Sequence, residues 1–401
     1  MFGGFSIVNE VSPAVRPEIK IEKWVYGGYG LARTDAGVVL TPFVLPGEIV
    51  KIGPLHKAHA PLEAIVTPSP DRAEPACPLF TRCGGCHYQH APYPFQLEQK
   101  VAILREQLQR VGKITFEGEI KVISGEPLGY RNRVQFHVDQ GRIGYIAGGS
   151  HKLVPVDGDC PIASPKLNEM LASLREKIHD PRWPKFVKTV ELFTNETDVQ
   201  INVVEAEKPV ARRFYDWMES VVALDYQTAA GNFRVSPKSF FQVNRFLIDP
   251  LTEAAIGGKS GEVALDLYAG AGLFALPLAK QFAKVTGVEA GSAAAHDLRF
   301  NAERAGVAVE AVYERVEDFL MNFEGSADYI LADPPRAGLG STVVYELNRI
   351  APQRITIVSC DPATLARDLA AMPGYRIEAL TLVDLFPQTF HMETVVDLVR
   401  I

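Results

Sequence analysis

Cys360 and Glu393 carry side chains that can take part in covalent catalysis, a thiol as the nucleophile and a carboxylate as the base. Cys360 directly follows an apolar run, Ile355–Ser359, and precedes an Asp-Pro pair. A thiol at a strand end, with a helix start beyond it, can have a lowered pKa and act as a nucleophile. A lone cysteine is more often a small buried hydrophobe. Glu393, in the sequence FPQTFHME, could act as a general base, and His391 could do the same.

The other four cysteines suggest a metal centre. Cys77, Cys83 and Cys86 are spaced C-x5-C-x2-C among prolines and glycines, and Cys160 lies further along the chain. Four soft thiolates suit a tetrahedral zinc ion or an iron–sulfur cluster. A structural zinc site usually has two C-x2-C pairs, so the one pair here favours iron–sulfur. Unrelated buried thiols are the remaining alternative.

A glycine turn indicates a nucleoside-type cofactor. The apolar run Val263–Tyr268 leads into Ala269-Gly270-Ala271-Gly272, and the next apolar run ends at Glu289. Small residues at a strand-to-helix turn let a ligand approach the backbone, and an acid after the second strand can accept hydrogen bonds from ribose hydroxyls. S-adenosylmethionine fits better than NAD, because no diphosphate requires a longer glycine loop.

Asp333 is a second candidate for this pocket. It follows the apolar strand end Leu331-Ala332 and precedes two prolines and Arg336. Prolines directly after a strand fix a rigid turn, and ligands bind at the carboxyl edge of such sheets. An exposed turn aspartate is the alternative.

Three regions would position these residues. Residues 12–70 contain short apolar stretches between glycine turns, which predicts a small β-barrel with Lys20, Lys23, Arg33, Lys51 and Lys57 at its strand ends. Residues 71–231 mix strand-like runs with helices predicted over Phe95–Val111 and near 165–178. Residues 232–401 contain strand–loop–helix repeats from about 262, which predict a parallel sheet with helices on both faces.

The 401-residue chain has ordinary globular composition, with 47% hydrophobic and 22% charged residues. Its net charge of −7 argues against a nucleic-acid partner, but residues 233–401 hold 15 basic and 21 acidic side chains, whereas residues 1–90 hold eight of each. The sequence contains neither an apolar run of roughly 18 residues nor a secretory signal, so a cytoplasmic protein without membrane spans is expected, and we expect a monomer.

Together these motifs resemble the RNA uracil-carbon-5 methyltransferases, which use S-adenosylmethionine to make 5-methyluridine in ribosomal and transfer RNA. The resemblance implies an α/β fold, in which a Rossmann-like methyltransferase domain follows a TRAM-like RNA-binding barrel and a mixed α+β central domain. It also implies a 4Fe-4S cluster. The ligands of that cluster would be Cys77, Cys83, Cys86 and Cys160, and the cofactor pocket would contain Gln242 of the sequence SFFQVN, Tyr268, Gly270, Glu289 and Asp333.

In the implied reaction Cys360 adds to carbon 6 of uracil, carbon 5 takes the methyl group, and Glu393 removes the carbon-5 proton. Gln242 and Asp333 are expected to hydrogen-bond the uracil edge. The stretch GYRNR, residues 129–133, resembles an RNA-contacting segment in which an aromatic ring could stack on a base. Leu273, Arg315 and Asp361 replace asparagines found in relatives.

Ribosomal RNA is the expected substrate. The alternatives are the same reaction on tRNA, an amino-group methyltransferase with a D-P-P-x pocket, and a non-catalytic RNA-binding or redox iron–sulfur protein.

Overall fold

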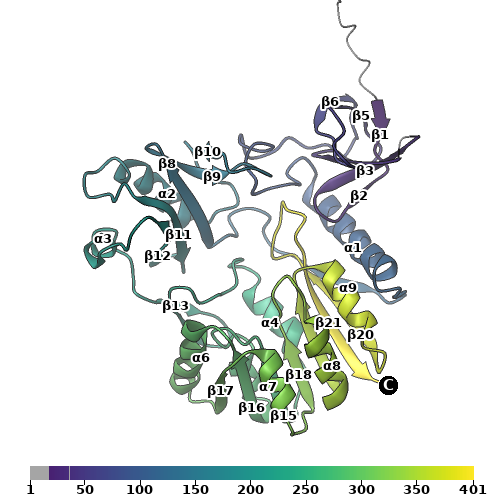
Figure 1. Cartoon of the computed structure of the whole chain (residues 1–401), viewed down its shortest axis with the longest axis vertical. Helices are drawn as coiled ribbons and strands as arrows, with labels where there is room; N and C mark the ends of the chain where they lie inside the picture. The colour runs from purple at the N-terminus through teal and green to yellow at the C-terminus, as the bar shows by residue number, and fades with distance from the viewer. Residues whose placement is uncertain (1–17, 36) are drawn as a thin grey trace, which may run out of the picture. The chain divides into compact units, whose positions relative to one another are not determined.

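The chain forms two compact units in a computed structural model that describes residues 18–35 and 37–401 (Figure 1). The first unit holds the described residues up to Glu74, together with His90–Pro92. The second holds Pro75–Gln89 and Tyr93–Ile401. The start of the predicted barrel, residues 12–17, lies outside the described residues.

The first unit consists of two small antiparallel sheets, ordered β1-β5-β6 and β2-β3-β4. Their bounds are β1 (Glu18–Lys20), β2 (Lys23–Val25), β3 (Tyr29–Thr34), β4 (Gly37–Pro42), β5 (Ile49–Ile52) and β6 (Leu62–Thr67). Ile21, Val44 and Val50 are buried between them. Two of the cations expected at the strand ends form exposed ion pairs, Arg33 with Glu22 and Lys51 with Glu18.

A five-stranded antiparallel sheet forms the middle of the chain, in the order β10-β9-β8-β11-β12. The elements are β8 (Arg133–Asp139), β9 (Arg142–Ile146), β10 (Leu153–Pro155), α2 (Pro165–Lys177), β11 (Val187–Thr194), β12 (Val199–Ala206) and α3 (Arg212–Trp217), followed by the hairpin β13 (Leu224–Gln227) and β14 (Asn232–Val235). Leu167, Leu171 and Leu174 of α2 pack into one core with Phe136 and Leu192 of the sheet. The mixed strands and helix predicted for this part are therefore confirmed.

The largest sheet of the described residues has eight strands, in the order β17-β16-β15-β18-β19-β21-β20-β7. Their bounds are β7 (Ile120–Ile123), β15 (Gly261–Leu267), β16 (Phe282–Glu289), β17 (Val309–Tyr313), β18 (Tyr329–Ala332), β19 (Arg354–Ser359), β20 (Tyr375–Val383) and β21 (Glu393–Arg400). Strands β15 to β19 pair in parallel, but β21 is antiparallel to both β19 and β20. The predicted parallel sheet is thus a mixed one.

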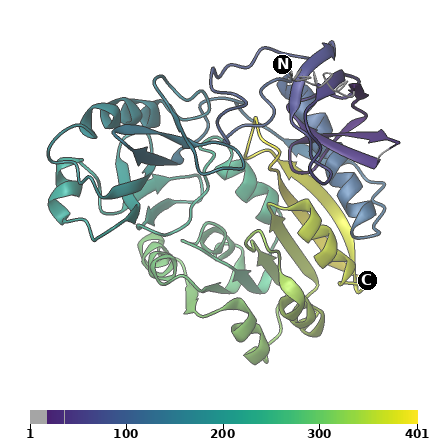
Figure 2. The same ribbon diagram turned by 45° about the horizontal axis from the view of Figure 1, so that its top comes forward.

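Helices flank this sheet (Figures 1 and 2). They are α1 (Tyr93–Arg110), α4 (Ile248–Ile256), α5 (Ala275–Leu278), α6 (Ser292–Ala305), α7 (Val316–Asn322), α8 (Gly340–Ile350) and α9 (Pro362–Ala370). All four residues of β18 are buried, which requires cover on both faces of the sheet. Within the described residues, none of the helices combines the length and the apolar character needed to cross a bilayer.

Two elements of the predicted central segment, 71–231, belong structurally to this sheet. Strand β7 pairs in parallel with β20, and helix α1 packs against α9. Both therefore link the cysteine-rich stretch that precedes α1 to the sheet that carries Cys360.

Candidate active site and cysteine cavity

Four predicted site residues meet at one edge of the large sheet, because each directly follows or ends a neighbouring parallel strand. Tyr268 follows β15, Glu289 ends β16, Asp333 follows β18, and one residue separates β19 from the N-cap of α9. That residue is Cys360. The chain leaves β15 toward β16 on one side and returns through β18 on the other, so this edge is the topological switch point where ligands bind in such folds.

The glycine turn after β15 has the backbone that small residues allow. Gly270 and Gly272 have φ angles of +55° and +95°. A Cβ on Gly272 would lie 2.6 Å from Leu276, so this glycine also permits close packing of the turn on α5. Glu289 accepts a hydrogen bond from the Gly270 N–H at 2.9 Å and one from Gly291 at 2.5 Å. Its carboxylate holds the turn and has further lone pairs for a ligand.

Three carboxyl groups are concentrated beside this turn, and two of them are buried so that their charged forms are disfavoured unless a cation binds. Burial raises the pKa of Asp266 well above its usual range, and Asp333 and Glu289 raise it further. Burial also raises the pKa of Asp333 to about 7. Within its described residues, the structure pairs none of these three carboxylates with a lysine or arginine. A ligand with positive charge and ribose hydroxyls, such as S-adenosylmethionine, fits this pocket.

The loop after Asp333 is held rigidly by α9. Asp368 accepts a hydrogen bond from the Leu339 N–H at 2.7 Å, and Arg367 donates to the Ala337 carbonyl at 2.8 Å. Asp333 itself donates its N–H to the Leu267 carbonyl of β15 at 3.2 Å. The backbone at Asp333 and in the loop after it is therefore held at the switch point.

Cys360 and Glu393 are neighbours across the antiparallel pair β19–β21, in which Ser359 lies opposite Thr394. Burial and the Glu393 carboxyl raise the pKa of the Cys360 thiol to about 12. Burial and Asp333 raise the pKa of Glu393 well above its usual range. The register thus brings the two residues together, but the lowered thiol pKa expected at this strand end is wrong, because burial and the neighbouring carboxyl both disfavour the thiolate.

Arg336 was not assigned a role from the sequence. Its side chain lies close enough to oppose the raised pKa of both Cys360 and Glu393. It is exposed and follows the Asp-Pro-Pro turn directly. The sequence signal was its place three residues after Asp333, which puts a cation near Cys360 and Glu393.

His391, the alternative base, has the opposite electrostatic character. Burial and the Arg336 guanidinium lower the pKa of His391 to about 3. An imidazole with so low a pKa is a weak proton acceptor. Glu393 is the stronger base of the two.

The three departures from the family pattern have structural explanations. Leu273 is buried in the core of the large sheet, where an apolar side chain packs without a polar partner. Arg315 is the N-cap residue of α7 and pairs with Glu317 at 3.5 Å. Asp361 is the N-cap of α9, and its carboxylate accepts from the Ala363 and Thr364 N–H groups, both at 2.9 Å. Because asparagine and aspartate are equally good N-caps, the last replacement conserves the local structure.

Gln242 is nearly buried, in the segment that runs alongside the GYRNR stretch. The Asn132 N–H donates to the Val243 carbonyl at 3.0 Å, and the Arg245 N–H donates to the Tyr130 carbonyl at 3.0 Å. Among the described residues, Gln242 shows no hydrogen bond to the four residues at the sheet edge.

The stacking role predicted for the aromatic ring of GYRNR is wrong. Tyr130 is fully buried, and its hydroxyl donates to the Pro387 carbonyl at 3.0 Å. Arg133 donates to the Ser239 carbonyl and pairs with Glu191 at 2.7 Å. Because the ring is buried and Arg133 is paired within the protein, Tyr130 and Arg133 connect parts of the chain structurally.

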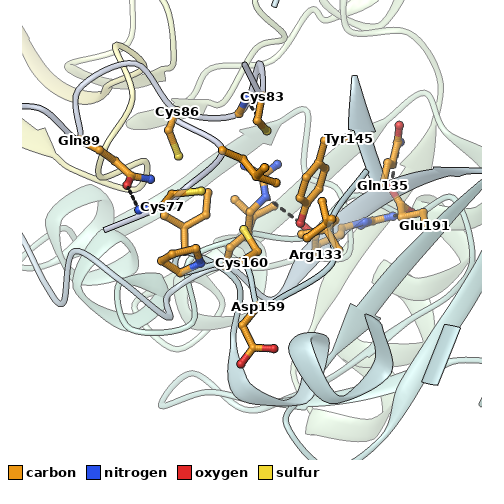
Figure 3. A pocket seen from close by; sticks show the side chains of 18 of the residues that line it. Cys77, Cys83, Cys86, Gln89, Arg133, Gln135, Tyr145, Asp159, Cys160 and Glu191 are labelled. Carbon is orange, nitrogen blue, oxygen red and sulfur yellow. Dashed lines mark hydrogen bonds and ion pairs between the residues drawn. The ribbon is translucent and has the colours of Figure 1, made fainter. Parts of the chain in front are cut away.

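The four remaining cysteines line one cavity of about 680 Å³ (Figure 3). The Gly84 N–H donates to the Ile146 carbonyl, which ties the C-x5-C-x2-C loop to β9. Asn168 of α2 clamps Cys160 by accepting from its N–H at 2.8 Å and donating to its carbonyl at 3.1 Å. Segments far apart in the sequence therefore present all four thiols to one space.

These thiols affect each other electrostatically. Burial raises the pKa of Cys83 to about 11 and that of Cys86 to about 12, and the charges of the neighbouring cysteines add to both. In the described part of the chain no group of three or more His, Cys, Asp or Glu side chains is placed to hold a metal ion. The metal site at these cysteines stays a prediction, although a cavity lined by four soft donors fits a multinuclear sulfur-ligated group.

The fold and the carboxyl-edge pocket define a Rossmann-like, S-adenosylmethionine-dependent methyltransferase. The family described as tRNA (Uracil-5-)-methyltransferase matches residues 183–401. An RNA methyltransferase of Aquifex aeolicus is 33% identical over 94% of this chain and 97% of its own length. The chain belongs to the tRNA (uracil-5-)-methyltransferase family.

Two further relatives have more specific names. A 23S rRNA (uracil(1939)-C(5))-methyltransferase of Pectobacterium atrosepticum is 33% identical over 92% of this chain and 90% of its own length. The crystal structure of Pyrococcus abyssi tRNA (uracil-54, C5)-methyltransferase in complex with S-adenosyl-L-homocysteine superposes with a TM-score of 0.77. It is 26% identical and covers 96% of this chain and 100% of that one. The similarity therefore extends over nearly the whole chain.

Proposed function

We propose that the protein methylates carbon 5 of a uracil in RNA, with S-adenosylmethionine as the methyl donor and Cys360 as the nucleophile. The observation that carries this proposal is the juxtaposition of Cys360 and Glu393 across β19 and β21, beside Asp333 at the switch point. An amino-group methyltransferase would need no thiol there, and a non-catalytic protein would need neither group.

Cys360 would act first, because carbon 5 of uracil is too weak a nucleophile to take a methyl group unaided. Its thiol first gives up its proton to solvent, because burial keeps the resting group protonated. The thiolate then forms a bond to carbon 6, and the electron pair of the double bond moves to carbon 5, which becomes enolate-like. Carbon 5 then displaces the methyl group from the sulfonium of the donor, and the neutral thioether leaves.

Glu393 would complete the reaction by accepting the proton from carbon 5. The electron pair left behind re-forms the double bond as the bond between carbon 6 and Cys360 breaks. We assign this step to Glu393 rather than His391 because the lowered pKa of the imidazole makes it the poorer acceptor. Gln242 and Asp333 are proposed to bind the uracil edge and the donor, as carboxylate and amide groups suit both.

We propose that Cys77, Cys83, Cys86 and Cys160 hold a 4Fe-4S cluster. The support is their shared cavity and the softness of four thiolates. A bound cluster would supply iron–thiolate bonds that cross-link residues 77–86 to Cys160. Anaerobic purification should give a brown protein with about four irons per chain, as that cluster type contains. A colourless protein with stoichiometric zinc would contradict this assignment.

We propose 23S rRNA as the substrate, because the relative that acts on it shares more of its sequence with this chain than the tRNA-modifying protein of known structure. The first unit would supply additional RNA contacts, and we expect the reaction to take place in the cytoplasm. The test is to incubate the protein with methyl-labelled S-adenosylmethionine and either 23S rRNA or tRNA lacking 5-methyluridine. Labelled 5-methyluridine in the rRNA is expected; label in tRNA alone would contradict the proposed substrate.

A further inference from the structure

The loop of residues 384–391, between β20 and β21, is bound by four other parts of the chain. Four consecutive carbonyl groups of the loop, from Leu385 to Gln388, each accept a hydrogen bond from a different segment. The donors are the Asn244 amide for Leu385, Lys100 for Phe386, the Tyr130 hydroxyl for Pro387, and the N–H groups of His87 and Tyr88 for Gln388. A loop held at four consecutive carbonyls has little freedom to move independently.

Gln388 joins this loop directly to the cysteine segment. The His87 and Tyr88 N–H groups lie 2.8 and 3.0 Å from its carbonyl oxygen, and His87 is the residue after Cys86. Gln388 has a φ of +67°, a conformation that non-glycine residues rarely adopt and that surrounding contacts must maintain. The ring of His87 also packs edge-on against Phe390, with centroids 4.6 Å apart.

Helix α1 completes the connection through a fully buried glutamine. Gln96 donates to the Tyr88 carbonyl at 3.1 Å and to the Gln388 side chain at 3.0 Å, and its own oxygen accepts from the Gln388 N–H at 3.1 Å. Four residues along the helix, buried Lys100 pairs with buried Asp384 at 2.5 Å. The helix therefore binds both the cysteine segment and the start and middle of the loop.

We propose that the cysteine segment positions Glu393 through Gln388 and Gln96, so that occupation of the cysteine cavity controls the proton-removal step. Glu393 begins β21, five residues after Gln388, and its carboxyl is buried beside Asp333. Gln96 and Gln388 act as positioning residues, since their contacts are with the two loops. The inference rests on the proposed function, in which Glu393 removes the carbon-5 proton.

The test separates bond formation at Cys360 from proton removal. With 5-fluorouridine in the RNA, Cys360 adds and the methyl group is transferred, but carbon 5 carries fluorine and no proton, so the covalent adduct persists whether or not the base is in place. With ordinary uridine, turnover requires the base. For Gln96→Leu we expect adduct formation on fluorinated RNA within about twofold of wild type, and turnover on uridine lower by about ten- to hundredfold. A denaturation-resistant protein–RNA adduct should then accumulate on uridine RNA.

Matched variants distinguish positioning from general damage. Gln107→Leu replaces another buried glutamine of α1, for which the described residues show no hydrogen bond to the loop, and it should change neither measurement. Gln388→Ala keeps the backbone carbonyl, so it should also retain adduct formation while losing turnover on uridine, but by less than Gln96→Leu. If Gln96→Leu does not fold, Gln388→Ala provides the test in its place. The inference would be overturned if the Gln96 and Gln388 variants lost adduct formation and turnover to the same extent, or if their turnover on uridine were unchanged.

The role of the cavity is tested on the wild-type chain, with iron removed by a chelator. Iron-depleted protein should still form the fluorinated adduct while its turnover on uridine falls, and restoring iron should restore turnover. Unchanged turnover after complete iron removal would contradict the coupling. Failure of the untreated wild type to form any fluorinated adduct is a separate result, which would instead overturn the proposed function.

Discussion

The two groups of thiols in this protein differ in their neighbours more than in their burial. Burial raises the pKa of Cys86 and of Cys360 to about 12 in each case. The next charges that act on Cys86 are other cysteines, whereas the next charge that acts on Cys360 is the Glu393 carboxyl. Thiols grouped with thiols suit metal ligation, and a thiol beside a carboxyl suits bond formation followed by proton removal.

The largest expected effect comes from removing Cys360. Cys360→Ala should abolish the covalent adduct and lower turnover by at least about 10⁴-fold, because no other group can add to carbon 6. Cys160→Ala is the matched control. It should lose iron but retain the adduct on 5-fluorouridine RNA, as gel shifts under denaturing conditions can show. An adduct that depended on Cys160 and survived loss of Cys360 would reverse the assignment of the two groups.

Glu393→Gln should have the next largest effect. The amide cannot accept the carbon-5 proton, so turnover on uridine should fall by about 10²–10⁴-fold while the adduct accumulates. His391→Asn provides the comparison, and it should leave turnover within about tenfold of wild type if His391 is not the base. Rapid-quench measurement of adduct and product checks both variants. A larger loss for His391→Asn would assign the proton transfer to the imidazole.

A smaller, pH-dependent effect is expected at Asp333. Its pKa is raised to about 7, so the carboxylate is charged above this pH and becomes neutral as the pH falls through it. The KM for S-adenosylmethionine should therefore rise about tenfold for each pH unit below 7, because the attraction to the positively charged donor is lost. Asp333→Asn should raise KM at pH 8 and remove the dependence. A KM of the wild type that is constant between about pH 6 and 8 would contradict this role.

The smallest expected effect is on stability at Asp361. Asp361→Ala removes two N-cap hydrogen bonds of α9 and should lower the free energy of unfolding by about 1 kcal/mol. Asp361→Asn, the residue found in relatives, should change it by less than about 0.5 kcal/mol. Urea denaturation followed by circular dichroism measures both. Equal destabilisation by the two variants would show that the carboxylate does more than cap the helix.

Local sequence was sufficient for residues that follow a strand directly. Cys360, Glu289 and Asp333 were placed at the sheet edge because parallel strands end together, and the structure brings them there. Glu393 joins them through the last strand, which the sequence predicts, but whose antiparallel direction it does not. Its neighbour across the sheet is set by register, which is a tertiary property.

The sequence was misleading where the same residue type suits either a binding surface or the protein interior. Tyr130 is aromatic and lies beside arginines, which suits base stacking, but the ring is fully buried and supports the loop before β21. The bond from Gln96 to Gln388 spans most of the chain, and neither glutamine belongs to a recognisable motif. Contacts of this kind depend on how the loop, α1 and the cysteine segment pack together.

The most direct test of the central claim is to locate the covalent bond. The protein is incubated with S-adenosylmethionine and RNA containing 5-fluorouridine, the adduct is digested, and the modified peptide is identified by mass spectrometry. We predict a methylated fluorouridine nucleotide on Cys360, with Cys77, Cys83, Cys86 and Cys160 unmodified. A nucleotide on any of those four cysteines, or RNA methylation without modification of Cys360, would contradict the division of the thiols into one nucleophile and four metal ligands.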